Sequence, residues 1–330
     1  MIVAASCGIE PSRVVEYQPI ITGALESTTH QPEYIVMLQR ETAPAELGER
    51  DVDWAELMAQ SSPVDPVPVA ATDPLYVLYT SGTTGRPKGV VRDNGGHAVG
   101  LAYSMAAVFD IHPGDVWWTA SDVGWVVGHS YIIYAPLLVG ATTVLYEGKP
   151  VGTPDAGAFW RVIAEHGVKA LFTAPTAIRA IKRVDPDGAE LAKYDLSGFQ
   201  TLFVAGERLD PETYHWASKA LGVPVIDNWW QTETGWPISA NLHGLERMPV
   251  KPGSSTMPVP GWDVQILDQS GDRLPNGREG AIVIKLPLPP GALATVWGDD
   301  QRYIEEYLSR YDGYYSPVMA ATSTRMATSS

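Results

Sequence analysis

Apolar runs separated by Gly and Pro turns organise the chain as far as about residue 315. Strand-like runs at 1–6 and 33–40 lie on either side of a predicted helix over 17–25. The first run has the composition of a buried strand that enters a turn, and this indicates that Met1 is not the natural beginning. Residues 60–72 are Pro-rich and predict an extended connector.

From Leu75 onward, strand-like and helix-like segments alternate. This alternation predicts parallel sheets covered by helices, which is an α/β fold. The expected strands are 75–80, 115–120, 141–147, 170–175 and 201–206, and the expected helices lie near 97–109, 129–138 and 155–166.

The pattern changes near Gly261, where two strands surround a Gly/Asn/Pro turn and predict a small antiparallel β element. Asn276–Gly277 is the strongest hairpin signal in this stretch. We therefore expect an α/β core over 1–260 and a β-rich element of the same large domain over 261–315. A tail over 316–330 shows neither helical nor strand periodicity.

Composition narrows the classes of function. With 330 residues, 45% of them hydrophobic and 18% charged, the chain is expected to be globular. The net charge of -15 argues against nucleic-acid binding but allows a nucleotide substrate, because backbone N–H groups can hold phosphates. Residues 131–145 are too short and interrupted to span a membrane. The single cysteine, Cys7, rules out an intramolecular disulfide, is expected to be structural and favours a cytoplasmic location.

The stretch "YTSGTTGRPKGV", residues 79–90, is the first candidate for chemistry. Its glycines let the backbone approach a polyphosphate, its hydroxyls can donate to it, and Lys88 adds a positive charge. The spacing is not that of a Walker A loop. A Gly-rich surface turn is the alternative when the stretch is considered alone.

This stretch matches without a gap the signature loop of the adenylate-forming acyl-CoA synthetase family, which the chain resembles. The resemblance continues in order through "LFTAPTAIRAI", "LFVAGERLD" and "DNWWQTETG". The sequences of residues 121–157 and 284–291 resemble the short-chain branch of this family, and they resemble propionyl-CoA synthetases more than acetyl-CoA synthetases. The resemblance implies the large domain of such an enzyme, without its start and its small C-terminal domain.

The resemblance also implies substrates and roles. ATP, CoA and propionate would be the small-molecule substrates, acetate would be the alternative acid, and Mg²⁺ would be the cofactor. Glu233 would bind Mg²⁺, Thr232 would contact the α-phosphate, and both would be catalytic together with Lys88; a helix N-terminal carboxylate is the other interpretation of Glu233. The phosphate loop would consist of Thr80, Ser81, Gly82, Thr83, Thr84, Gly85 and Lys88.

Two further subsites are implied. The acyl pocket would be lined by Trp125, Val126, Ala205 and Trp230, with core packing as the alternative for both tryptophans. Acetate-specific relatives tend to carry valine at the Ala205 position, so the smaller side chain favours propionate by about one methylene, or ~1–3 kcal/mol. The adenine site would be formed by Gly206, Glu207 and Arg208 on one side and by Asp227, Asn228, Trp229, Trp230, Gln231 and Thr232 on the other.

In the family, a ribose-binding aspartate and a lysine-bearing domain follow the position of Tyr315. When the codons of the tail are regrouped by one nucleotide, they can encode Thr-Gly-Asp-Gly-Gly-Tyr-Val, which resembles that continuation. We interpret 316–330 as the product of a frameshift, with a disordered terminus as the alternative. Impaired turnover, or a non-catalytic fragment, is then expected. Sequencing the gene through the Tyr315 codon tests this.

Overall fold

The structure is a computed structural model that describes residues 1–80 and 86–317. The chain divides into two compact units, Met1–Pro68 and the part from Val69 onward. The division lies within the Pro-rich connector predicted over 60–72, where residues 61–70 form no helix or strand. The domain boundary expected at residue 260 stays a prediction, and the tail from residue 318 onward lies outside the described residues.

The first unit contains a three-stranded parallel sheet, in the order β1-β4-β5, and an antiparallel hairpin of β2 and β3. The strand expected at the start is present, but Val3 within it is 55% exposed, so the expectation of a buried strand was wrong. Cys7 is buried, as expected. The elements are β1 (Ile2–Ala5), β2 (Cys7–Glu10), β3 (Arg13–Glu16), α1 (Gln18–Glu26), β4 (Ile35–Leu38), β5 (Asp51–Asp53) and α2 (Trp54–Gln60).

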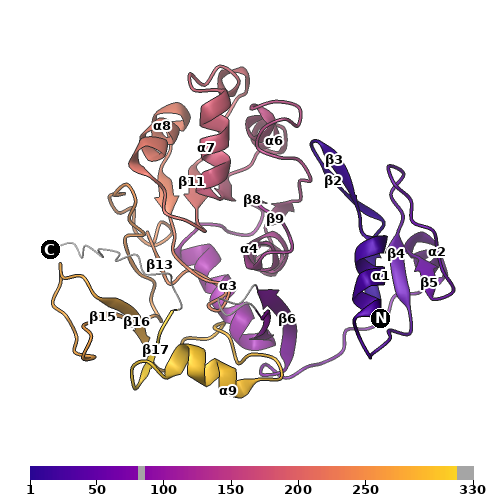
Figure 1. Ribbon diagram of the computed structural model, residues 1–330. Helices are drawn as coiled ribbons and strands as arrows, with labels where there is room; N and C mark the ends of the chain where they lie inside the picture. The colour runs from indigo at the N-terminus through magenta and orange to yellow at the C-terminus, as the bar shows by residue number, and fades with distance from the viewer. Residues whose placement is uncertain (81–85, 318–330) are drawn as a thin grey trace. The chain divides into compact units, whose positions relative to one another are not determined.

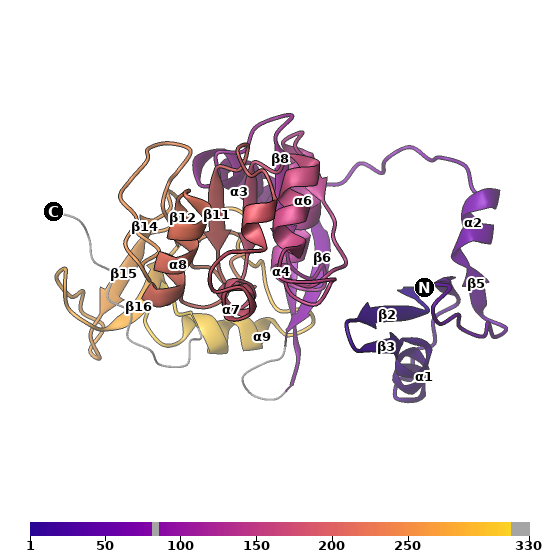
Figure 2. The same ribbon diagram turned by 90° about the horizontal axis from the view of Figure 1, so that it is seen from above.

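The second unit is built on a five-stranded parallel sheet in the order β12-β11-β10-β8-β9. Its strands are β8 (Val116–Ala120), β9 (Thr142–Val144), β10 (Ala170–Thr173), β11 (Thr201–Val204) and β12 (Val225–Asp227). Figure 1 shows α6 (Ala158–His166), α7 (Pro175–Val184) and α8 (Pro211–Leu221) on one face of this sheet, and α3 (Asn94–Ala107) on the other. The same three helices lie nearest the viewer in Figure 2. The predicted α/β architecture is confirmed.

The two apolar cores of this unit follow from the pleat of the strands, which turns successive side chains to opposite faces. Trp117 and Trp118 are neighbours on β8 and both are fully buried, yet they belong to different clusters. Trp117 packs with Phe109 of the α3 side, and Trp118 packs with Phe159 of α6. The continuous apolar runs of the sequence are therefore strands covered on both faces.

The helix expected near 129–138 is present but irregular. It consists of α4 (Val126–Gly128), a π-helical segment (His129–Tyr134) and α5 (Ala135–Leu138). Pro136 has no N–H to donate to the carbonyl of Ile132, and the Thr143 hydroxyl donates to that carbonyl instead, at 2.8 Å. The wider turn is thus stabilised from the sheet side.

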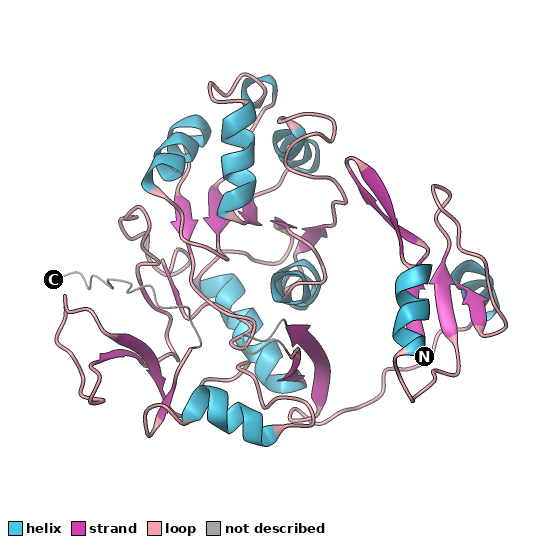
Figure 3. Ribbon diagram, in the orientation of Figure 1, coloured by secondary structure: helices cyan, strands magenta, loops and turns pink. Residues whose placement is uncertain are grey.

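Two antiparallel parts complete the unit. β6 (Pro74–Thr80) pairs with β7 (Lys88–Asp93), so the first strand of the predicted alternation does not join the parallel sheet. Near the end, β15 (Val264–Leu267), β16 (Ala281–Lys285) and β17 (Tyr314–Tyr315) form the predicted antiparallel element, seen as strands in Figure 3. Residues 268–280 connect β15 to β16, so Asn276–Gly277 lies inside a longer loop. The remaining elements are β13 (Ser239–Ala240), β14 (Met257–Pro258), a short 3₁₀ helix (Leu191–Lys193), α9 (Asp300–Tyr303) and a π-helical segment (Ile304–Leu308).

Candidate functional site

The predicted phosphate loop connects the two strands of the β6–β7 hairpin. Thr80 and Lys88 form the last strand pair, one on each side of the loop. The loop residues Ser81, Gly82, Thr83, Thr84 and Gly85 lie outside the described residues. The Thr80 hydroxyl is buried and has no hydrogen-bond partner within the described part of the chain. The hairpin therefore carries Lys88 at the base of the loop.

Lys88 and Glu233 are brought together, as the predicted site requires. The Lys88 ammonium lies 3.1 Å from Glu233 Oε1 and 3.1 Å from Glu306 Oε2, and it also contacts the Tyr307 hydroxyl. Lys88 is 4% exposed, and its three N–H donors match these three oxygen partners. The ammonium thus points into the protein, where it balances two carboxylates.

Glu306 extends this cluster to Arg302, which the sequence analysis did not single out. Arg302 Nε lies 2.7 Å from Glu306 Oε1, and its terminal nitrogens donate to the carbonyl oxygens of Arg86 and Pro87 at 2.9 and 3.2 Å. Burial opposes ionisation of Glu306, but the hydrogen bonds from Arg302 and Lys88 outweigh it and lower its pKa. One guanidinium therefore holds both the Glu306 carboxylate and the end of the predicted phosphate loop.

Residues 294–297 deliver this segment to the site by running along β7. The Val91 N–H donates to the Thr295 carbonyl at 3.0 Å, and the Trp297 N–H donates to the Gly89 carbonyl at 2.8 Å. The chain then enters α9 with Arg302, followed by Glu306 and Tyr307. The long sequence separation between Lys88 and Tyr307 is closed by backbone pairing.

Arg92 fixes the turn that carries Thr232 and Glu233. It is fully buried on β7 and donates to the carbonyl oxygens of Thr232, Glu233 and Gly291. Gly235 has φ +75°, and a Cβ there would meet the Arg92 guanidinium at 2.8 Å. The turn therefore needs both the buried Arg92 and Gly235. No local sequence pattern indicated this role of Arg92.

The two predicted adenine walls follow neighbouring parallel strands, β11 and β12. The Leu209 N–H donates to Asp227 Oδ2 at 3.1 Å, which ties the loop after β11 to the end of β12. Glu207 is exposed and pairs with Arg179 of α7. A crevice beyond the carboxyl ends of parallel strands is the usual ligand position in open α/β sheets. Gly206, Arg208, Asn228, Trp229 and Gln231 lie on these same two segments.

The acyl-pocket residues are only partly gathered. Trp230 stacks on Phe172 with ring centres 6.3 Å apart and meets Tyr131 edge-on at 5.4 Å, and Ala205 belongs to the same apolar cluster. Trp125 is 67% exposed, and Val126 begins α4 beside it. The roles of Trp125 and Val126 therefore stay predictions.

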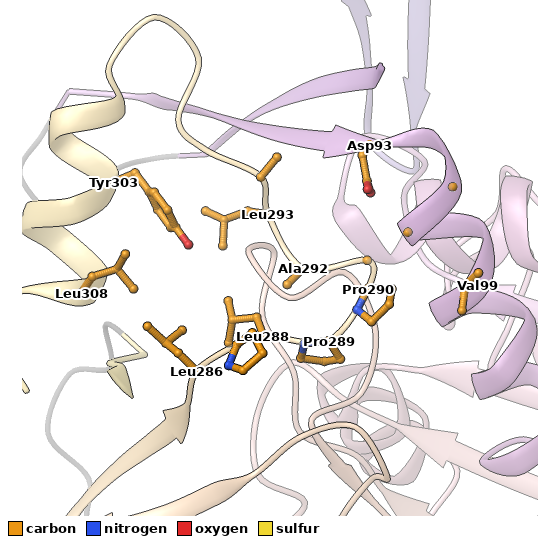
Figure 4. Close-up of a pocket in the computed structure, with 15 residues that line it drawn as sticks. Asp93, Val99, Leu286, Leu288, Pro289, Pro290, Ala292, Leu293, Tyr303 and Leu308 are labelled. Carbon is orange, nitrogen blue, oxygen red and sulfur yellow. The ribbon is translucent and has the colours of Figure 1, made fainter. Parts of the chain in front are cut away.

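A pocket of about 710 Å³ is lined in part by the segment that carries Gly291 and Leu293. Figure 4 shows its leucine and proline side chains facing the opening, with Asp93 near the start of α3. The Leu293 N–H donates to the Glu233 carbonyl at 2.7 Å, so this wall also supports the Glu233 turn. None of the predicted site residues lines the pocket.

Asp227 gives a pH-dependent prediction. Burial raises its pKa to about 6, against the opposing hydrogen bonds from the Leu209 and Asn228 N–H groups. Between about pH 4 and 6 the folded state keeps a proton that the unfolded chain has lost, so this residue's contribution to stability falls as pH rises through that window. Replacing Asp227 with Asn is expected to stabilise the protein by about 2–3 kcal/mol at pH 7.5 and by little at pH 4.

Urea unfolding followed by tryptophan fluorescence at both pH values measures this difference. Asp187→Asn removes the same charge from an exposed turn and serves as the control. An equal gain for Asp227→Asn at pH 4 and pH 7.5 would contradict burial of the carboxylate as the cause.

Comparison with known proteins decides the family. The sequence profile of the AMP-binding enzyme matches residues 8–289. The chain belongs to the AMP-binding enzyme family. It is 54% identical over 324 residues to human acyl-CoA synthetase short-chain family member 3, mitochondrial, covering 97% of this chain and 47% of that protein.

Two further similar proteins support the assignment to the short-chain acyl-CoA synthetases. The chain is 45% identical over 316 residues to the propionate–CoA ligase of Escherichia coli K12, covering 94% of this chain and 50% of that one. Acetoacetyl-CoA synthetase from Streptomyces lividans has the same fold, with a TM-score of 0.84 over 95% of this chain and 48% of that one, at 24% identity. The predicted membership of the short-chain branch is confirmed, and the chain spans about half the length of these relatives.

The described part of this AMP-binding enzyme contains no helix long and apolar enough to cross a membrane. Four residues that contact the predicted site, directly or through one another, were not expected from the sequence: Arg92, Arg302, Glu306 and Tyr307. The spacing of Arg302 and Glu306 is that of an i,i+4 ion pair, which was the one available signal.

Proposed function

We propose that the protein is an ATP-dependent short-chain acyl-CoA synthetase that converts propionate, ATP and CoA into propionyl-CoA, AMP and pyrophosphate. The observation that carries the proposal is the contact between Lys88 and Glu233 at the loop end of the β6–β7 hairpin. It joins two motifs that lie far apart in the sequence, and the names of the relatives supply the reaction class.

The first step is in-line displacement at the α-phosphorus. A carboxylate oxygen of propionate forms the new bond, and the bond from the α-phosphorus to the bridging oxygen breaks, so that pyrophosphate leaves. Thr232 would contact the α-phosphate, and the residues from Thr80 to Lys88 would hold the β- and γ-phosphates. Positioning and charge stabilisation dominate catalysis of such transfers. The CoA sulfur then attacks the acyl carbon, and AMP leaves.

Glu233 fits the role proposed for it toward Mg²⁺. Its Oε1 is held by Lys88 and Tyr307, and its Oε2 has no hydrogen bond within the described residues. A carboxylate oxygen together with water and substrate phosphates is the usual environment of Mg²⁺ at nucleotide sites. When bound, this ion would neutralise charge on the phosphate oxygens. Lys88 can donate to a phosphate only after releasing one of its present partners.

Exchange of labelled pyrophosphate into ATP tests the proposal. We expect exchange that depends on propionate, with acetate a poorer substrate by about tenfold or more. Faster exchange with acetate would indicate an acetate–CoA ligase, the alternative substrate. If soluble, folded protein shows no exchange with either acid, the non-catalytic alternative replaces the proposal. The cytoplasmic location and the lack of nucleic-acid partners stay predictions.

Ala205 gives a specificity prediction. Replacing Ala205 with Val adds bulk beside the aromatic cluster of Trp230, and it is expected to lower the ratio of kcat/KM for propionate over acetate by about 10–100-fold. Exchange rates measured across concentrations of both acids give this ratio. Ala205→Gly, which adds no bulk, should leave propionate preferred. An unchanged ratio in Ala205→Val would remove Ala205 from the acyl pocket.

A further inference from the structure

The two oxygens of the Glu233 carboxylate have different surroundings. Oε1 accepts a hydrogen bond from the Tyr307 hydroxyl at 2.6 Å and lies 3.1 Å from the Lys88 ammonium. Oε2 has no hydrogen bond within residues 1–80 and 86–317. The Glu233 side chain is 12% exposed, so its orientation is set mainly by what binds Oε1. One oxygen is held by the protein while the other is left for a ligand.

The position of the Tyr307 hydroxyl is fixed by the packing of the Tyr307 ring. The ring is 1% exposed and stacks on Tyr315 with centres 5.3 Å apart and planes 5° apart. The Lys88 ammonium lies 4.6 Å from the centre of the same ring. The Ser316 N–H donates to the Tyr307 carbonyl at 2.7 Å, which fixes the backbone as well. A hydroxyl on so constrained a side chain can direct a carboxylate.

Glu306 supports the same oxygen indirectly. Its Oε2 lies 3.1 Å from the Lys88 ammonium, and its Oε1 is held by Arg302. Lys88 is thereby fixed between Glu306 and Glu233. Without the Glu306 charge, the ammonium would lose one of its two carboxylate partners and would hold Glu233 less firmly.

We infer that Tyr307, directly, and Glu306, through Lys88, are positioning residues that hold Oε1 of Glu233 so that Oε2 faces the Mg²⁺ that accompanies ATP. This inference rests on the proposed function. Neither residue needs to touch the substrate. Groups that hydrogen-bond to a metal-binding carboxylate typically contribute about 10–100-fold to metal affinity. The coupling between Mg²⁺ and ATP binding should therefore depend on both residues.

The test is calorimetric titration of the full 330-residue protein with ATP, once with Mg²⁺ and once with a chelator. Tyr307→Phe removes only the hydroxyl and keeps the ring stacked on Tyr315. It is expected to weaken ATP binding in Mg²⁺ by about 10–100-fold and to leave the affinity measured in chelator within about twofold. Glu306→Gln should act in the same direction through Lys88, and it decides the question if Tyr307→Phe does not fold.

Matched controls lie on the same segment. Tyr303→Phe removes a hydroxyl from the preceding turn, where the described residues offer it no hydrogen-bond partner, and its ring centre is 6.0 Å from that of Tyr307. Glu305→Gln neutralises the neighbouring, exposed carboxylate, which pairs with Gln301. Both should bind ATP as the unmodified protein does, with and without Mg²⁺.

The remaining outcomes separate the inference from the proposed function. If the unmodified protein binds ATP more tightly with Mg²⁺ and both variants keep that difference, the positioning role is overturned. Equal weakening with and without Mg²⁺ would also overturn it, because that result indicates general loss of packing. If the unmodified protein binds no ATP under either condition, the proposed function itself fails.

Discussion

Replacing Glu233 with Gln is expected to lower the rate of propionate-dependent ATP–pyrophosphate exchange by about 10²–10³-fold, the cost typical of removing one electrostatic group from a transition state. Gln has nearly the same size, and its amide oxygen can still accept the hydrogen bond from Tyr307. What it loses is the negative charge beside the proposed Mg²⁺ position. The measurement is the exchange rate at saturating substrates.

Stability serves as the internal control for this variant. The amide keeps the volume and an acceptor, and Lys88 keeps its ion pair with Glu306, so the loss of stability should be smaller than that expected for Lys88→Met. Glu305→Gln changes the same residue type on an exposed position and should exchange at the normal rate. Exchange in Glu233→Gln within about threefold of the unmodified protein would show that the carboxylate has no role in adenylation.

The parts of the fold that local patterns encode were predicted well. Four of the five strands of the parallel sheet, β8 to β11, were expected from short apolar runs, because strands buried on both faces leave that pattern. β12, which has only three residues, was not expected. The connector over residues 60–72 was also predicted, from its prolines. The pairing of β6 with β7 was not predicted, since the residues of a strand do not determine whether its neighbour runs parallel or antiparallel. The helix near 129–138 was expected, but its π-helical segment was not, because that segment depends on the contact between Thr143 and Ile132.

The site divides in the same way. Lys88 and Glu233 lie in recognisable motifs, and the structure brings them together. The sequence around Arg92 indicates only a strand. Its structural role, which is to donate hydrogen bonds to the Thr232 and Gly291 carbonyls, depends on the tertiary fold. Long-range contacts of this kind cannot be deduced from spacing. They had to be seen in the fold.

Replacing Lys88 with Met is expected to lower the free energy of unfolding by about 3–5 kcal/mol, because breaking a buried ion pair leaves an uncompensated charge. Here two carboxylates would lose a shared partner, although Arg302 continues to pair with Glu306. Urea unfolding followed by tryptophan fluorescence measures the change. Every tryptophan except Trp54 lies in the unit that contains Lys88, so the signal reports mainly on that unit.

Two comparisons separate charge burial from simple loss of a lysine. Lys219→Met, on the exposed side of α8, should change the unfolding free energy by less than about 0.5 kcal/mol. Adding Glu233→Gln to Lys88→Met should recover part of the loss, because it removes the charge of the carboxylate that Lys88→Met leaves without an ionic partner. If Lys88→Met costs less than about 1 kcal/mol, the ammonium is not the stabilising partner of these carboxylates. Lys88 would then be free to leave Glu233 for a phosphate at little cost, and its main role would be in binding ATP rather than in holding the site together.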